Sequence, residues 1–208
     1  MMTNCMTSSK YIVIVGPDGC GKTSVADKLA EAQRSESLVR RMNFSFGILP
    51  SISTILQRVP KEALPEGQKN AGMVEPLHPL KASILAIWYG IDHLLGVFVL
   101  RKNIGSVTIF ARSYHDFIYQ RAYKRLPRFI PAIFLALGPK PDLVVLPLRD
   151  AKSIHDMKPE LTKTEIMEQY ARVSRQFGRL AYFNEIDGTP GIESVVSEIQ
   201  LTVFGEKC

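Results

Sequence analysis

The residues best suited to chemistry are concentrated in one short stretch near the start of the chain. Residues 16–23 read Gly-Pro-Asp-Gly-Cys-Gly-Lys-Thr and match the pattern G-x-x-x-x-G-K-[ST] at every fixed position. Glycines let the backbone curl so that successive N–H groups point at an anion. Lys22 would bring a full charge to the β- and γ-phosphates of a nucleotide, and the Thr23 hydroxyl is suited to ligate Mg²⁺. The stretch therefore predicts a loop that binds ATP and Mg²⁺.

The sequence on either side of this stretch supports that interpretation. Residues 11–15 are typical of a short buried strand, and residues 24–33 are typical of a helix with one apolar face. The helix N-terminus would add a positive partial charge at the phosphates. The alternative is an ordinary glycine turn before a helix. The residues expected to contact the triphosphate here are Gly16, Asp18, Gly19, Cys20, Gly21, Lys22, Thr23 and Ser24.

Two residues within the stretch need separate interpretations. An acid such as Asp18 beside a phosphate site is electrostatically unfavourable unless it has another partner, although Asp is also common in solvated turns. Cys20 lies at a helix N-terminus, where the pKa of a thiol tends to fall. We therefore consider it either oxidation-prone or simply a small residue.

Length and composition favour one cytoplasmic domain. The 208 residues suffice for a single α/β domain, and the formal net charge of +6 suits anionic ligands, although a solvated basic surface would have the same charge. Cys5, Cys20 and Cys208 are scattered, so no disulfide framework or zinc spacing is predicted. No basic run interleaved with aromatic residues indicates nucleic-acid binding.

One apolar stretch could be mistaken for a membrane span. Residues 82–100 are mostly apolar and about long enough to cross a bilayer. Asp92 and His93 lie in the middle of this stretch, where ionisable groups are costly in lipid. We expect a buried helix with no stable membrane insertion, and this helix could also form the interface of a homodimer.

Strands and helices alternate along the whole chain. Further strands are expected at residues 38–42, 106–110, 143–146 and 182–186. Further helices are expected at residues 52–58, 82–100, 117–126, 130–137, 164–181 and 192–203, with Thr189 and Pro190 at the start of the last one. Segments 60–79 and 149–163 are expected to be a mobile surface segment and an irregular charged segment. This order predicts a mainly parallel sheet of about five strands, covered by helices on both faces, with ligands at the carboxyl ends of the strands.

Three separate pieces of the chain resemble one family. The loop has the form G-x-D-G-x-G-K-T, residues 110–114 read Phe-Ala-Arg-Ser-Tyr, and residues 157–161 read Met-Lys-Pro-Glu-Leu. They are similar to the loop, the strand-end D-R-Y region and the lid R-K-x-E-L of thymidylate kinases. The chain as a whole resembles the thymidylate kinase-like P-loop kinases of the nucleoside monophosphate kinase superfamily.

This resemblance implies a three-layer P-loop NTPase fold with a small lid at about residues 149–163. It implies transfer of a phosphoryl group from ATP–Mg²⁺ to a nucleoside monophosphate or a similar phosphorylated acceptor. Lys22, Arg112 and Asp18 would be the catalytic residues, with Asp18 facing the acceptor's sugar. Arg149 and Lys158 would supply lid charge over the triphosphate, although solvated loop charges would look the same. Arg112 could instead belong to a structural ion pair.

The chain departs from the family pattern where the metal site is expected. Ala111 stands where the family has an acid that helps to hold Mg²⁺, and Met157 stands where the lid has an arginine. Asp150 and Asp187 follow their strands and are candidate substitutes, whereas Asp142 precedes its strand, at the wrong end of the sheet. Two alternatives therefore stay open: a kinase with a non-nucleotide acceptor such as a sugar, or a nucleotide-binding module with little turnover.

Overall fold

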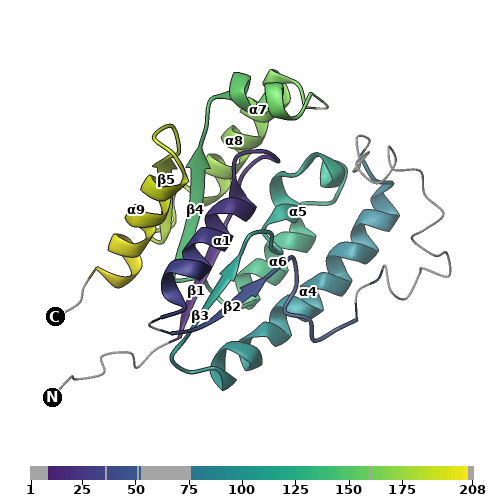
Figure 1. Cartoon of the computed structure of the whole chain (residues 1–208). Coiled ribbons are helices and arrows are strands. Elements are labelled where there is room, and N and C mark those ends of the chain that lie inside the picture. Colours follow the sequence, from purple (N-terminus) through teal and green to yellow (C-terminus); the bar gives the residue numbers. More distant parts are fainter. Residues whose placement is uncertain (1–8, 36, 51, 53–75, 160, 206–208) are drawn as a thin grey trace, which may run out of the picture.

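The fold is one parallel sheet between two helical layers (Figure 1). The computed structural model of the chain describes residues 9–35, 37–50, 52, 76–159 and 161–205. The expected helix at residues 52–58, except Ile52, and the expected segment at 60–79, except its last four residues, lie outside this part. The strands are β1 (Lys10–Ile14), β2 (Leu38–Met42), β3 (Ser106–Phe110), β4 (Leu143–Leu148) and β5 (Phe183–Asp187).

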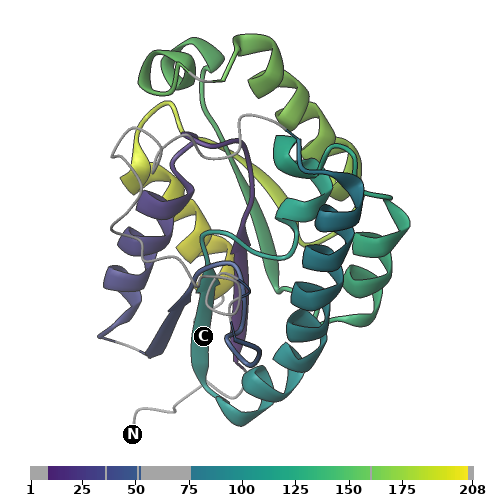
Figure 2. The same ribbon diagram turned by 90° about the vertical axis from the view of Figure 1, so that its right-hand side faces the viewer.

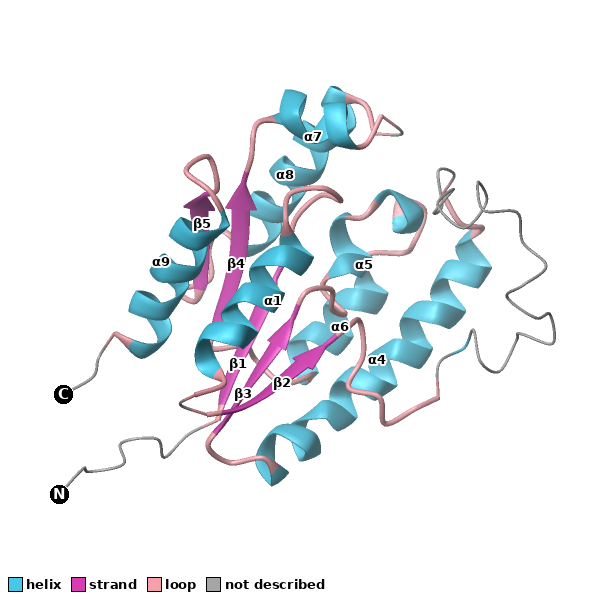
Figure 3. Ribbon diagram, viewed as in Figure 1, coloured by secondary structure: helices cyan, strands magenta, loops and turns pink. Residues whose placement is uncertain are grey.

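All strand pairs in the sheet are parallel, and the strand order is β2-β3-β1-β4-β5. The three inner strands consist largely of β-branched and apolar residues, as expected for strands that are buried on both faces. Because every connection returns to the same end, the carboxyl ends of all five strands meet at one edge (Figure 3). The predicted five-stranded parallel sheet with helices on both faces is confirmed.

Helices cover both faces of the sheet (Figure 2). The helices are α1 (Lys22–Gln33), α4 (Pro79–Lys102), α5 (Asp116–Tyr119), η2 (Arg121–Tyr123), α6 (Phe129–Leu137), α7 (Ala151–Met157), α8 (Lys163–Phe177) and α9 (Ile192–Phe204). One apolar core joins α1 and α9 to the sheet, and a second core on the opposite face includes residues of α4, α5 and α8. A third cluster joins α4, α5 and α6.

Several predicted boundaries were wrong. Residues 117–126 form no single helix, because Gln120 is extended (φ −71°, ψ 144°) and separates α5 from η2. Segment 149–163 is not irregular, because it contains α7. The last helix begins at Ile192, after Gly191, which has a positive φ of 126°, so the expected start at Thr189 lies before it. The helix expected at 164–181 ends at Phe177, before Gly178.

The long helix α4 is held to the rest of the domain by a buried carboxylate. Asp92 is 1% exposed and accepts hydrogen bonds from the backbone N–H groups of Phe46 at 2.6 Å, Ile48 at 2.8 Å and Leu49 at 2.9 Å. Two glycines allow close approach on the same helix. A Cβ on Gly90 would lie 2.5 Å from the Phe134 ring, and one on Gly96 would lie 2.3 Å from the Phe46 ring.

α4 is also the one helix in the described part of the chain that is long and apolar enough to cross a membrane. Only 28% of the 18 residues in its apolar stretch are buried, so the expectation of a buried helix was only half right. Asp92 and His93 face the interior, while Leu80 and Phe98 are 65% and 63% exposed. The inner face of α4 belongs to the core, and its outer face carries exposed apolar side chains.

Candidate phosphate-binding site

The glycine-rich loop connects the end of β1 to the start of α1, at the carboxyl edge of the sheet (Figure 1). Gly16, Gly19 and Gly21 all have positive φ, at 136°, 96° and 101°. Residues with a Cβ rarely adopt these backbone conformations, so the loop depends on glycine at these positions. At Gly16 space is also short, because a Cβ there would lie 2.8 Å from Sγ of Cys20 and 3.0 Å from Leu146.

The loop offers unpaired backbone donors. Within the described part of the chain, the N–H groups of Gly19, Gly21, Thr23 and Ser24 form no hydrogen bond. The first N–H groups of a helix have no partner in the preceding turn, and they carry the positive end of the helix dipole. The side chains of Thr23 and Ser24 are exposed at the start of α1. This arrangement suits an anion with several oxygen atoms.

Lys22 is folded back over the loop that precedes it. Its Nζ donates to the carbonyl oxygens of Gly16 at 2.6 Å and Pro17 at 2.8 Å, and lies 3.3 Å from Oδ1 of Asp18. The residue is only 5% exposed, so its charge is held close to the centre of the loop. The predicted position of Lys22 at a phosphate site is consistent with this geometry.

Asp18 joins the two candidate catalytic cations. Nη2 of Arg112, which follows β3, donates to Oδ1 of Asp18 at 2.8 Å, the same oxygen that Lys22 approaches. Burial by itself would raise the pKa of the Asp18 carboxyl, but the charges of Lys22 and Arg112 outweigh it and lower the pKa below its ordinary value. Asp18 is therefore an ionised partner of two cations and not a freely solvated turn residue. Arg112 is both at the predicted site and in an ion pair.

Sequence reasoning missed a buried carboxylate beside the loop, Asp116. Asp116 on α5 is 1% exposed and accepts a hydrogen bond from the Tyr119 hydroxyl at 2.5 Å. The Tyr119 oxygen in turn accepts the backbone N–H of Gly16 at 3.1 Å. Burial raises the pKa of Asp116 to about 6, against the opposing charge of Lys22. Asp116 and Tyr119 thus position the first residue of the loop.

The segment predicted as a lid packs directly on the loop. Ile154 of α7 is fully buried in a cluster with Cys20, and a Cβ on Gly19 would lie 3.0 Å from Ile154 and 3.5 Å from Lys158. Lys158 also helps to lower the pKa of Asp18, so the structure brings this predicted residue to the site. Arg149 is exposed, and its backbone N–H donates to the Tyr170 hydroxyl at 3.1 Å. The structure does not bring the Arg149 side chain into contact with the loop.

Burial changes the interpretation of Cys20. Cys20 is 4% exposed, and this burial raises the pKa of its thiol. The neighbouring charge of Lys22 only partly offsets the increase. The fall in thiol pKa that a helix N-terminus can cause was therefore the wrong expectation here. Cys20 fills the space between the loop and α7 as a small apolar side chain.

Thr23 remains the candidate metal ligand, and no cluster of acids joins it. The described residues include no group of three or more His, Cys, Asp or Glu side chains that could hold a metal ion. Ala111 is 1% exposed and belongs to the apolar core on the α1 face. The donors present fit Mg²⁺ only as a partner of Thr23 and of phosphate oxygens, the usual arrangement for an ion that keeps much of its water.

The acids considered as substitutes for Ala111 lie as their strands predict. Asp142 accepts the backbone N–H of Tyr11 at 2.7 Å, at the amino end of the sheet. Asp150 and Asp187 follow β4 and end β5 at the carboxyl edge, but each is used locally. Asp150 accepts the N–H of Ser153 at 3.0 Å and caps α7, and Asp187 accepts the N–H of Thr189 at 2.8 Å.

Comparisons with known proteins add no assignment. No protein-family model matches the chain, and no curated protein sequence matches it. The class that fold and site define is an α/β protein with a five-stranded parallel sheet and a glycine-rich loop at its carboxyl edge.

Proposed function

We propose that the protein is a P-loop kinase that transfers a phosphoryl group from ATP to a nucleoside monophosphate, in the manner of thymidylate kinases. The observation that carries the proposal is the contact of Lys22 and Arg112 with one oxygen of Asp18, over a loop with unpaired N–H groups. In phosphoryl transfer, catalysis is almost entirely positioning and electrostatic stabilisation, and this cluster supplies both.

Each of the residues at the loop has a distinct part in this proposal. The loop N–H groups and the α1 N-terminus hold the donor phosphates, and Lys22 exchanges carbonyl oxygens for phosphate oxygens at short range. Arg112 binds the transferred or the acceptor phosphate as a fixed planar fork, with Asp18 orienting its guanidinium. Mg²⁺, when bound beside Thr23, would neutralise phosphate charge. The acceptor phosphate is itself the nucleophile, so no strong general base is needed.

Lys22→Ala tests the proposal. We expect transfer from labelled ATP to a panel of nucleoside monophosphates and sugars to fall by about 10²-fold or more, by analogy with other removals of transition-state charge. The increase in melting temperature on adding ATP–Mg²⁺ should also disappear. Lys28→Ala is the matched control, because Lys28 lies on the exposed side of the same helix and pairs with Glu31 at 3.7 Å. An unchanged thermal shift in Lys22→Ala would disprove the assignment of the loop.

A second candidate function is a nucleotide-binding module with little turnover. The observation that favours it is Ala111, an apolar buried residue where an acid near the metal is expected. The two candidates differ in the response of Ala111→Asp to Mg²⁺. If Ala111 is a lost metal-site acid, the variant should need a lower Mg²⁺ concentration for half-maximal transfer at saturating ATP. A higher requirement, or loss of activity, would show that the site has adapted to the small residue.

A further inference from the structure

Two packed helices carry rows of exposed apolar side chains. On α4 the row consists of Leu80, Ile84, Ile87, Ile91 and Phe98, which are 41–65% exposed and recur every three, four or seven residues. On α6 it consists of Phe129, Ile133 and Leu137, which are 50–71% exposed and recur every four residues. Such spacing places each row on one side of its helix. We call the two rows together the outer apolar face.

Both rows point to the same side of the molecule. Gly90 of α4 and Phe134 of α6 mark the contact between the helices, and both helices run in the same direction before their strands (Figure 1). With about 100° of rotation per residue, the α4 row lies about a quarter turn to one side of Gly90. The α6 row lies about a quarter turn from Phe134 in the opposite sense. Because the two helices are parallel and the two rotations have opposite senses, both rows point to the same side, away from the sheet.

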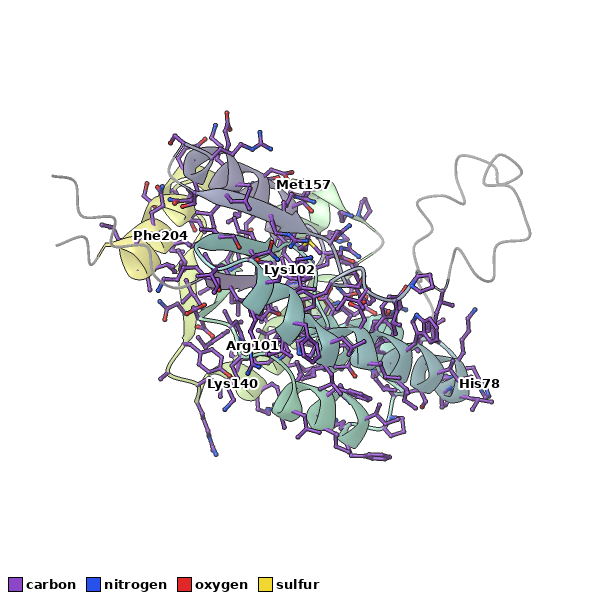
Figure 4. The ribbon with its side chains drawn as sticks, turned by 90° about the horizontal axis from the view of Figure 1, so that it is seen from below. His78, Arg101, Lys102, Lys140, Met157 and Phe204 are labelled. Carbon is purple, nitrogen blue, oxygen red and sulfur yellow. The ribbon has the colours of Figure 1, made fainter. Side chains whose placement is uncertain are left out.

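The segment that forms this face carries exposed charges of one sign, although Glu165 of α8 lies beside it and pairs with Arg121 at 2.8 Å. Residues 76–141 contain nine Lys and Arg but only two acids, Asp92 and Asp116, and both acids are 1% exposed. The exposed cations of this segment are Lys81, Arg101, Lys102, Lys124, Arg125, Arg128 and Lys140. Figure 4 shows Arg101, Lys102 and Lys140 near one end of the α4–α6 layer, with His78 at the other end of α4. The face is therefore apolar in the middle, with Arg101, Lys102 and Lys140 near one end and Lys81 in the first turn of α4 at the other.

We propose that the outer apolar face docks the protein on the surface of an anionic lipid bilayer. Amphipathic surfaces with apolar side chains on one face and basic residues beside them bind in this way, burying the apolar residues at the boundary between headgroups and acyl chains. Cations near an anionic leaflet strengthen the attraction. This inference does not depend on the proposed function, because none of its residues belongs to the phosphate site.

The same observations disfavour two alternatives, namely insertion of α4 across the bilayer and a second copy of the chain bound to this face. α4 cannot leave the fold to span a bilayer without breaking the three hydrogen bonds of Asp92. A second copy of the chain, as in the homodimer considered from the sequence, would bring the same patch against itself across a two-fold axis. The exposed cations of segment 76–141, which contains no exposed acid, would then face one another, and like charges across an interface oppose association.

Vesicle flotation tests the proposal with the full chain. We expect the protein to float with vesicles of phosphatidylglycerol and phosphatidylcholine, to float at least tenfold less with pure phosphatidylcholine, and to be released by salt. Phe98→Glu and Leu137→Glu should each lower binding to the anionic vesicles at least tenfold. Leu201→Glu is the matched control, because Leu201 is 72% exposed on α9, in the opposite helical layer.

Charge variants and oligomeric state complete the test. Lys102→Ala should lower binding about fivefold through the lost attraction to the anionic surface, and Lys28→Ala on α1 should leave it unchanged. Unaltered thermal melts of all variants would show that the fold is kept. Equal flotation of Phe98→Glu and the natural protein would overturn the proposal. A dimer in sedimentation that Phe98→Glu dissociates, with no flotation of the natural protein, would overturn it too and identify a second copy as the occupant.

Discussion

Asp92 and Asp116 are both almost fully buried carboxylates, but they are held in different ways. Asp92 accepts three backbone N–H groups from residues 46–49. Asp116 accepts side-chain donors, the Tyr119 hydroxyl at 2.5 Å and the Gln120 amide at 2.9 Å, and lies behind the phosphate loop. Backbone donors fix where a chain segment lies, whereas side-chain donors can rearrange. Asp92 therefore holds the architecture of the fold, and Asp116 belongs to the candidate site.

The largest effect is expected from Asp92→Ala. Removing the carboxylate leaves three N–H groups without a partner, which should lower the free energy of unfolding by about 4 kcal/mol. For a chain of this length the melting temperature should fall by roughly 10 °C. Asp92→Asn should lose about half as much, because one oxygen can still accept from Ile48 and Leu49. Thermal or urea unfolding measures both variants, and equal stability of Asp92→Ala and the natural protein would contradict the structural assignment.

Asp116 should make stability depend on pH. Below pH 3.8 the residue is protonated in both states. Between pH 3.8 and about 6 the unfolded chain loses the proton while the folded chain keeps it, so stability falls across this window and stays lower above it. The shift corresponds to about 3 kcal/mol. Asp116→Asn should therefore gain stability relative to the natural protein between pH 4 and pH 7.

Free energies of unfolding measured at pH 4 and at pH 7, for the natural protein and for Asp116→Asn, check this expectation. Asp187→Asn is the matched control with the opposite sign, because hydrogen bonds from Thr189 lower the pKa of Asp187 and favour its ionised form in the folded state. A difference between Asp116→Asn and the natural protein that does not change with pH would show that Asp116 does not titrate differently on folding.

Tyr119→Phe is expected to have the smallest effect of the three and to sharpen the link between Asp116 and the loop. The variant leaves the buried N–H of Gly16 without its acceptor at 3.1 Å, at a cost of about 2 kcal/mol. Because Gly16 begins the loop, a higher ATP concentration should be needed for a half-maximal thermal shift. Tyr114→Phe, which removes a hydroxyl bonded to Ala86 in the α4 layer, should leave that concentration unchanged. If both variants change the required ATP concentration equally, the hydrogen bonds that join Asp116 to the loop do not contribute to ligand binding.

Much of the fold could be predicted because the inner strands are short apolar runs flanked by glycine or proline and alternating with helices. The loop could be predicted because its glycine positions and Lys22 are fixed by the geometry of phosphate binding. The role of Asp116 could not, because it depends on the hydrogen bond between Tyr119 and Gly16, which lie 103 residues apart in the sequence. The break at Gln120 was missed as well. Propensity favoured a continuous helix there, and tertiary packing overrode it.

The outer face of α4 also escaped sequence reasoning. Apolar residues lie all round this helix, so its periodicity does not show which side meets the sheet. The glycines at 90 and 96 carry the missing information, since each marks a place where an aromatic ring from another element lies against the backbone. Only the fold identifies those rings as Phe134 and Phe46.

Trp88 gives the α4 layer an optical signal of its own. It is the only tryptophan in the chain, and its indole N–H donates to the Pro50 carbonyl at 3.1 Å. The stretch from Phe44, whose N–H donates to the Arg112 carbonyl at 2.7 Å, to Pro50 therefore connects a candidate catalytic residue with a single fluorophore. Emission from the natural chain, without any label, should report whether this stretch stays on α4 when a nucleotide or a lipid surface is added.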